Sequence, residues 1–272
     1  MKALAAGNAR LHYSVPTTGT YYLAVFDNDN DNGIGTYSVG AYRRIILPTS
    51  NFDDILTGSN SPDTFLMGRG NDSCRGNGGD DLLDGGEGLD TITYAGPAAN
   101  YSIERVPVGG WSKTAAFGFV VRDKVGTEGS DTVVDVERIR FSDSRLALDL
   151  QGNAGTTVKI IGAVFGKEAV NIKEYVGIGL TQLDGGTSRD SLISLALQAR
   201  FGGTPSATDL VNVLYTNVVG VAPAAADLKY YTDLLSSGAY TPISLAGLAS
   251  DTGLNLSNIG YESLVNTGIG YV

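Results

Sequence analysis

Apolar residues recur at three different periods along this 272-residue chain, and each period predicts a different structure. Between residues 49 and 93 one apolar side chain appears every nine residues, among glycines and aspartates. From residue 94 to about residue 150 apolar and polar positions alternate, which predicts β-strands with one buried face. From about residue 154 the apolar positions return every three or four residues, which predicts amphipathic helices.

The nine-residue period is carried by two kinds of residue at once. The aspartates stand nine apart, and an apolar residue follows each of them by two positions: Asp54 and Leu56, Asp63 and Phe65, Asp72 and Cys74, Asp81 and Leu83, Asp90 and Ile92. Glycines crowd the positions before the later aspartates: Gly68, Gly70, Gly76, Gly78, Gly79, Gly85, Gly86 and Gly88. Glycine permits tight turns with positive φ, so each repeat predicts a turn followed by a short strand whose apolar residue points inward.

The frame G-G-x-G-x-D-x-U-x, which residues 85–93 match completely, resembles the calcium-binding nonapeptide of secreted repeats-in-toxin (RTX, hemolysin-type) proteins. The resemblance implies a parallel β-roll in which turn carbonyls and aspartates bind about two to three calcium ions. The residues that match the binding positions are Asp54, Asp63, Gly68, Gly70, Asp72, Gly76, Asn77, Gly79, Asp81, Gly85, Gly86, Gly88 and Asp90. A flexible Gly/Asp linker is the alternative, but it does not explain the common phase of aspartates and apolar residues.

In such a roll two nonapeptides make one coil, so the resemblance implies ions between turns eighteen residues apart. That spacing pairs Asp54 with Asp72, Asp63 with Asp81 and Asp72 with Asp90, while positions 99 and 108 hold Ala99 and Val108 and supply no carboxylate. The first two turns depart from the frame at Phe52, Ser59, Ser61 and Pro62. We therefore expect the strongest site at Asp72 and Asp90.

The segments on either side of the repeats predict further modules. Residues 94–153 contain Gly129-Ser-Asp-Thr-Val-Val-Asp-Val-Glu-Arg-Ile-Arg-Phe-Ser-Asp143 and resemble the segment that closes the roll in secreted RTX proteins. Residues 1–48 predict a β-hairpin that resembles the last strands of the bacterial pre-peptidase C-terminal domain, a β-sandwich. Its Asp27–Gly33 loop is either a polar hairpin tip or a calcium loop, although it lacks the distant Glu of an EF-hand.

Residues 154–272 predict an all-α domain of five to seven short helices. Thr187-x-x-Asp190 and Ser206-x-x-Asp209 are typical helix starts, while Gly185, Gly202 and Gly238 are typical stops. The stretch from Leu214 to Gly238 resembles a helical domain of unknown function found beside RTX repeats. The expected fold class is therefore a multi-module chain: a parallel β-roll of RTX nonapeptides flanked by antiparallel β-strands, then an all-α C-terminal domain. The expected modules are residues 1–48, 49–93, 94–153 and 154–272, and the resemblance implies a secretion signal within the last.

Charge narrows the expected partners. The chain carries a net charge of −10, and residues 49–93 alone hold nine acids against two arginines. An acidic chain is a poor partner for nucleic acid, whereas a dense carboxylate block suits a bound cation. Cys74 is the single cysteine, so no intrachain disulfide is expected, and a metal would be the stabilising substitute. No apolar run reaches the length of a membrane span, and the first residues do not form a convincing signal peptide.

The residues offer no catalytic constellation. His12 is the single histidine, which rules out an H-E-x-x-H zinc site and any Ser-His-Asp triad drawn from the body of the chain. Cys74 occupies an inward repeat position and is expected to be a buried hydrophobe. Asp80 and Asp81 stand together like a glycosidase pair, but the repeat already accounts for Asp81. We expect no enzyme activity from this chain.

These observations favour a non-catalytic calcium-binding module of an extracellular or surface protein that folds on calcium binding. The resemblance implies export by a type I secretion system, with that machinery as a partner. One alternative is the non-catalytic C-terminal half of a secreted hydrolase such as a protease. Another is a surface-layer or filament protein that self-associates through its helical tail.

Overall fold

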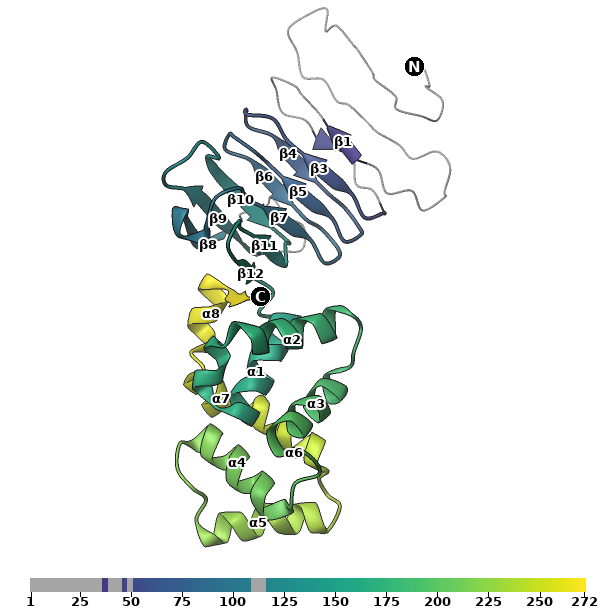
Figure 1. Cartoon of the computed structure of the whole chain (residues 1–272), viewed down its shortest axis with the longest axis vertical. Coiled ribbons are helices and arrows are strands. Elements are labelled where there is room, and N and C mark those ends of the chain that lie inside the picture. The colour runs from purple at the N-terminus through teal and green to yellow at the C-terminus, as the bar shows by residue number, and fades with distance from the viewer. Residues whose placement is uncertain (1–35, 39–45, 48–50, 109–115) are drawn as a thin grey trace, which may run out of the picture.

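The computed structural model describes residues 36–38, 46–47, 51–108 and 116–272. Strands make up the first half of this part and helices the second, and the C-terminus lies where the two meet (Figure 1). The predictions for His12, for the Asp27–Gly33 loop and for most of the N-terminal hairpin lie outside the described residues.

Successive strands of the repeats alternate between two sheets. The first sheet takes β1 (Thr36–Ser38), β3 (Ile55–Thr57), β5 (Ser73–Arg75) and β7 (Thr91–Thr93). The second takes β2 (Ile46–Leu47), β4 (Thr64–Leu66) and β6 (Leu82–Asp84). Neighbouring strands within a sheet are parallel, and Leu56 lies opposite Cys74 as Phe65 lies opposite Leu83. One coil of the chain therefore takes eighteen residues, two nonapeptides long.

The five apolar residues predicted to point inward form the core between the two sheets. Their exposed fractions lie between 0 and 4 %: Leu56, Phe65, Cys74, Leu83 and Ile92. Burial of a side chain of this size contributes about 1.5–3 kcal/mol. Strands β3 to β7 are each three residues long and each has one inward apolar position, so the core holds a single file of apolar side chains from each sheet. The inward prediction for this segment is confirmed.

The segment after the repeats does more than cover the end of the stack. We expected antiparallel strands here, and β8 (Tyr101–Pro107) and β9 (Phe117–Asp123) do form an antiparallel hairpin. However, β10 (Ser130–Val134) pairs in parallel with β6, and β11 (Arg138–Arg140) pairs in parallel with β7. The reason is that Val133 and Ile139 take the inward positions next to Leu83 and Ile92, which extends the core by another coil.

Residues 153–267 form eight α-helices, one more than the upper end of the prediction. They are α1 (Asn153–Phe165), α2 (Lys173–Asp184), α3 (Arg189–Phe201), α4 (Ala207–Val219), α5 (Ala225–Ser236), α6 (Pro242–Ser250), α7 (Gly253–Asn258) and α8 (Tyr261–Thr267). Ser206 caps α4 by accepting the Asp209 N–H, as predicted, whereas α3 is capped by Ser188 rather than Thr187. None of the helices in the described part of the chain has both the length and the hydrophobicity to span a membrane.

The expectation of an all-α C-terminal domain is wrong in its last residues. After Gly268 the chain forms β13 (Ile269–Tyr271), which pairs antiparallel with β12 (Arg145–Ala147) at the end of the first sheet. Ile269 is buried in a core shared by the strands and by α1 and α2. The strand forms because β12 would otherwise present an unpaired edge, and α2 then packs over β13.

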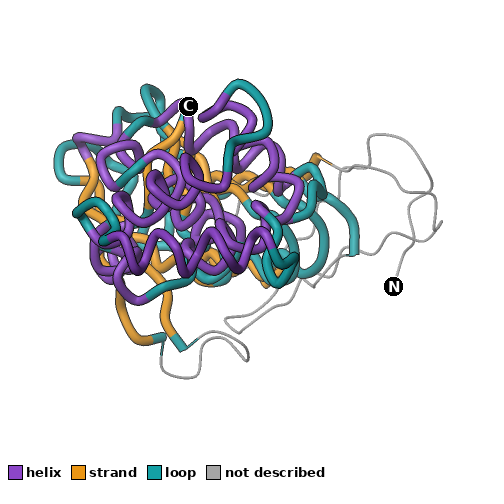
Figure 2. Tube along the Cα trace, turned by 90° about the horizontal axis from the view of Figure 1, so that it is seen from below, coloured by secondary structure: helices purple, strands orange, loops and turns teal. Residues whose placement is uncertain are grey.

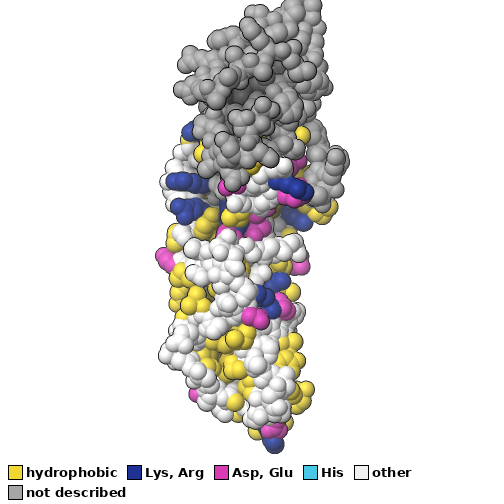
Figure 3. Space-filling view, turned by 90° about the vertical axis from the view of Figure 1, so that its right-hand side faces the viewer, with side chains coloured by type: hydrophobic (Ala, Val, Ile, Leu, Met, Phe, Trp, Pro, Cys, Tyr) yellow, Lys and Arg dark blue, Asp and Glu magenta, His cyan; other side chains and the backbone are white. Residues whose placement is uncertain are grey.

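Strands and helices are joined end to end, with the helices forming a layered group below the strands (Figures 1 and 2). On the face shown in Figure 3, charged side chains gather over the strand part, while hydrophobic and uncharged side chains dominate over the helices. A buried core of the helices, made mainly by α1, α3, α4 and α6, is separate from the core between the sheets. On this face the charged side chains therefore lie mainly over the strands.

Candidate metal centre

The repeat aspartates line the two edges of the strand stack in separate rows. Row A contains Asp54, Asp72 and Asp90, each directly before a strand of the first sheet. Row B contains Asp63 and Asp81, each directly before a strand of the second sheet. All five are buried, with exposed fractions of 7 % or less. Ionised carboxylates are costly to bury unless they are paired, so their partners decide what the rows can do.

One oxygen of each later aspartate is bound by the main chain of the aspartate eighteen residues earlier. The Asp54 N–H donates to Asp72 Oδ1 at 2.7 Å, and the Asp72 N–H donates to Asp90 Oδ1 at 2.8 Å. In row B the Asp63 N–H donates to Asp81 Oδ1 at 2.8 Å. The pairs implied by the resemblance are thus in direct contact along each edge.

Both rows continue past the repeats, which sequence reasoning missed. The Asp81 N–H donates to Asp131 Oδ1 at 3.0 Å, and the Asp90 N–H donates to Glu137 Oε2 at 2.8 Å. The expectation that Ala99 and Val108 leave Asp81 and Asp90 without a further carboxylate is therefore wrong. The chain returns to the stack only after the β8–β9 hairpin, so the acids come from residues outside the nine-residue phase.

A sequence signal for these two acids does exist. Asp131-Thr-Val133 and Glu137-Arg-Ile139 repeat the spacing of an acid followed two residues later by an inward apolar residue. The two acids are missed because they lie far from Asp90 in the sequence and outside the nine-residue spacing. At the end of row B the Tyr94 hydroxyl donates to Asp131 Oδ2 at 2.9 Å, so both oxygens of this last carboxylate are bound.

The second oxygens of three aspartates have no partner. Asp72 Oδ2, Asp81 Oδ2 and Asp90 Oδ2 are buried and accept no hydrogen bond, and none of the three aspartates belongs to an ion pair among the described residues. Asp63 differs, because its Oδ2 accepts both the N–H and the Oγ–H of Ser59. Ser59 stands where the frame calls for glycine, so this departure from the repeat removes an unpartnered oxygen.

Main-chain carbonyls crowd the same places. The Cβ of an alanine at Gly85 would lie 2.2 Å from Asp135 O and 2.6 Å from Asp90 Oδ2. At Gly76 it would lie 2.1 Å from Asp81 Oδ2. The turns themselves stack closely, because a Cβ at Gly86, where φ is +90°, would lie 2.2 Å from Gly68 O. The space beside the unpartnered oxygens exists only because these positions are glycine, and other oxygens face it.

Burial makes these carboxylates hard to ionise in the absence of a cation. It raises the pKa of Asp72 to about 7, with the charge of Asp90 adding to the effect. It also raises the pKa of Asp81 and the pKa of Asp90 to about 6. At the row ends, burial raises the pKa of Asp131 to about 7 and the pKa of Glu137 to about 8. A bound cation would reverse these shifts, because it stabilises the charged form.

The donors at these positions are oxygens. In the part of the chain that the structure describes, no three His, Cys, Asp or Glu side chains gather as a metal-binding group, so main-chain carbonyls would have to supply most ligands. Cys74 is buried in the core, where burial raises the pKa of its thiol, and it cannot serve as a thiolate ligand. Asn77 takes φ +68° and donates through Nδ2 to Gly58 O at 2.6 Å, which ties adjacent turns of row B. The residues present fit a hard cation.

Gly85→Ala is expected to destabilise the protein by about 1–3 kcal/mol, because the new methyl group overlaps Asp135 O and Asp90 Oδ2. Thermal unfolding in saturating calcium measures this. Gly203→Ala is the matched control, since nothing lies within 4 Å of its Cβ position, and it is expected to change stability by less than about 1 kcal/mol. Equal effects of the two changes would contradict a crowded space at Gly85.

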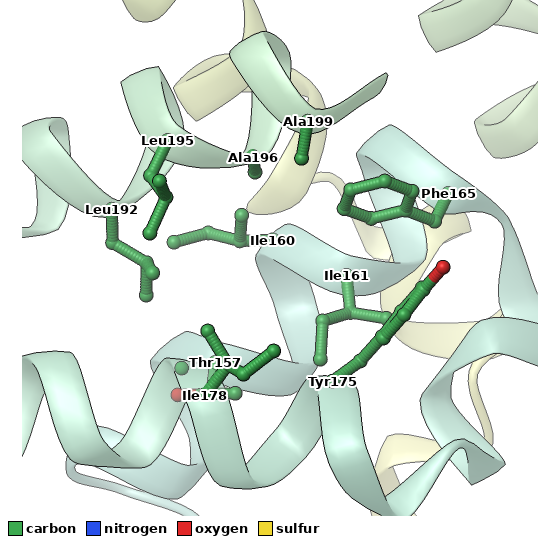
Figure 4. Close-up of a pocket in the computed structure, with 11 residues that line it drawn as sticks. Thr157, Ile160, Ile161, Phe165, Tyr175, Ile178, Leu192, Leu195, Ala196 and Ala199 are labelled. Atoms are coloured by element: carbon green, nitrogen blue, oxygen red, sulfur yellow. The ribbon is translucent and has the colours of Figure 1, made fainter.

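The helices contain a different kind of site, an apolar pocket of about 150 Å³ between α1, α2 and α3 (Figure 4). Phe165 and Tyr175 meet at one end, with ring centroids 5.2 Å apart, and Leu192 and Leu195 lie at the other. Thr157 contributes the only side-chain polar group besides the Tyr175 hydroxyl. The mainly apolar lining of the pocket offers hydrophobic contact.

No protein-family model matches the chain, and no curated protein is similar to it in sequence. Among solved structures it is similar to the extracellular lipase LipA from Serratia marcescens, with 18 % sequence identity and a TM-score of 0.31. The match covers 44 % of this chain and 16 % of the lipase chain. The similarity is therefore to a small part of that protein and does not extend to its activity.

Proposed function

We propose that this chain is a calcium-binding, non-catalytic module whose strand part is a parallel β-roll of the RTX type. The observation that carries the proposal is the set of three buried oxygens without partners: Asp72 Oδ2, Asp81 Oδ2 and Asp90 Oδ2. A buried charge without a partner costs several kcal/mol, and a bound cation offsets that cost. Both rows repeat the same arrangement, so one kind of ion would serve each turn.

Calcium suits these oxygens better than other common ions. Ca²⁺ takes six to eight oxygen ligands in flexible geometry and accepts main-chain carbonyls, which the stacked turns present in number. Mg²⁺ demands regular octahedral geometry and keeps its water, whereas Zn²⁺ prefers the nitrogen and sulfur ligands that these turns lack. Extracellular sites of this class bind calcium with Kd of about 10⁻⁴–10⁻³ M, so they fill outside the cell and remain empty inside it.

This difference in calcium concentration supports a role outside the cell. A chain that cannot complete its strand part at intracellular calcium stays partly unfolded there, which suits passage through a type I secretion system. Calcium then drives folding after export, because it binds the folded state alone. The protein would act as an extracellular or surface module, and we propose no catalytic activity for it.

Asp72→Asn is expected to raise the calcium concentration at the folding midpoint about tenfold or more. The asparagine keeps an acceptor for the Asp54 N–H at Oδ1, and it replaces the unpartnered Oδ2 and its charge with an amide nitrogen. The loss of one charged ligand is expected to weaken the binding free energy of the ion by at least about 1.4 kcal/mol, which corresponds to about tenfold in affinity. Far-UV circular dichroism titrated with calcium measures the midpoint.

Asp53→Asn is the matched control. It removes the same charge from the adjacent residue, but Asp53 is exposed and its Oδ1 accepts the Asn71 N–H at 2.7 Å. Its midpoint is expected to shift much less than that of Asp72→Asn, because the exposed charge of Asp53 is the smallest of the neighbouring charges that raise the pKa of Asp72 and Asp90. A spectrum of the wild type that does not change between EGTA and millimolar calcium would overturn the proposed function.

A further inference from the structure

The last turn of row A is shorter than the turns before it. The connection from β4 to β5 is six residues long (67–72), and so is the connection from β6 to β7 (85–90). The connection from β10 to β11 has only three residues (135–137). Arg138 nevertheless lies opposite Thr91 and Val134 lies opposite Asp84, so the short turn spans the same gap. The turn 135–137 has no glycine loop. In a full repeat, the carbonyls of such a loop would lie on the far side of turn 85–90.

A cation in turn 85–90 therefore needs ligands from elsewhere, and Asp84 stands where they are missing. The corresponding residues in the other strands of the repeats are Thr57, Leu66, Arg75 and Thr93, none of them acidic. Asp84 is half-buried, and its carboxylate accepts the Gly86 N–H, inside the same turn. Asp84 directly precedes Gly85, the glycine that opens this turn.

Two further oxygens face the same space. Asp90 is fully buried, and its Oδ2 accepts no hydrogen bond. This Oδ2 lies 2.6 Å from the position that a Cβ at Gly85 would take. Asp135 O lies 2.2 Å from that position. The free oxygen of Asp90 and the carbonyl of Asp135 thus face each other beside Gly85, and Asp84 directly precedes this glycine, where the regular pattern of turn carbonyls ends.

We propose that Asp84, Asp90 and the main-chain oxygen of Asp135 bind a divalent cation, in a closing site that differs from the repeat sites. This inference rests on the proposed function and adds to it a ligand from outside the binding positions of the nonapeptide. Two carboxylates balance the charge of one divalent ion. The Asp84 side chain takes the place of the carbonyls that the three-residue turn does not supply.

The test is the number of calcium ions bound by the full chain, measured by equilibrium dialysis at saturating calcium, with Asp84→Asn and Asp84→Leu. Each variant is expected to bind one ion fewer than the wild type, or to bind that ion at least tenfold more weakly. Asp84→Leu restores the residue type that Leu66 provides one coil earlier, so the strand can pack as β4 does. Far-UV circular dichroism in calcium verifies that the remaining coils are folded.

Glu87→Gln is the control in the same turn, because its side chain is 73 % exposed and pairs with Arg69 on the surface. It is expected to bind as many ions as the wild type. If both Asp84 variants bind as many ions as the wild type with unchanged affinity, while Asp72→Asn still weakens binding, the closing site is wrong and the proposed function stands. If the wild type binds no calcium, the proposed function itself fails.

Discussion

Removal of calcium is expected to unfold the strand part, from residue 51 to about residue 147, and to leave most of the helices in place. Three buried carboxylate oxygens lose the cation that we propose for them, and like charges then face each other along both rows. The helices keep a core of their own, built from α1, α3, α4 and α6. Circular dichroism in EGTA is expected to lose its strand signal and retain most of its helical signal.

The pH dependence in EGTA provides a check on the same groups. Burial raises the pKa of Asp72 to about 7 and the pKa values of Asp81 and Asp90 to about 6, from a usual value of 3.8. Between about pH 4 and about pH 7 the folded chain then binds more protons than the unfolded chain, so calcium-free stability falls as the pH rises through this range. In EGTA the strand signal of circular dichroism is therefore expected to be recovered as the pH falls towards about 5, and a strand signal that instead grows from about pH 5 to about pH 8 would contradict the raised pKa values.

Arg138→Met is expected to destabilise the protein in saturating calcium by about 3–5 kcal/mol. The Arg138 side chain is 4 % exposed. Its Nη1 lies 2.5 Å from Asp149 Oδ1, and its Nη2 lies 2.8 Å from Asp184 Oδ2. Methionine fills much of the same volume but leaves two carboxylates near each other without their cation. Because Asp184 ends α2 and Asp149 precedes α1, the change also loosens the contact between strands and helices. Chemical denaturation in saturating calcium measures the loss.

Arg69→Met is the control for this prediction. Arg69 pairs with Glu87 at 3.1 Å, but the two side chains are 65 % and 73 % exposed, so the loss is expected to stay below about 1 kcal/mol. Similar losses for the two variants would mean that Arg138 acts as an ordinary surface ion pair rather than as the buried link between α2 and β11.

The repeats were the most predictable part of the fold. Aspartates such as Asp72 and Asp90 recur every nine residues, and so do the apolar residues two positions after them, Cys74 and Ile92. This repeat predicts both the turn and the inward residue, because the short strand between turns has room for one inward position. The eighteen-residue pairing followed from the resemblance, and the contacts between Asp72 and Asp90 agree with it. The nine-residue repeat alone does not predict which strands form the ends of the two sheets.

The remaining features depend on contacts between distant residues. Glu137 joins row A across 47 positions, after the chain has formed a separate hairpin, so no local pattern predicts its partner. The strand at Ile269–Tyr271 is too short to show alternation and forms because β12 offers it an edge. In α3, Ile193 and Leu197 are buried while Leu195 and Ala199 are exposed, a choice of face that the spacing of apolar residues alone does not make. Neighbouring helices determined which side of α3 faces the core.

The hairpin of β8 and β9 interrupts the stack without disturbing it. Between β7 and β10 the chain departs for 36 residues, yet β10 returns as the next parallel neighbour of β6 and continues row B through Asp131. A turn on this edge is therefore a permissive site for insertion, where added sequence changes neither the spacing of the coils nor the order of the acids. Such an edge lets the module acquire a new surface by evolution or by grafting, while rows A and B and the core stay as they are.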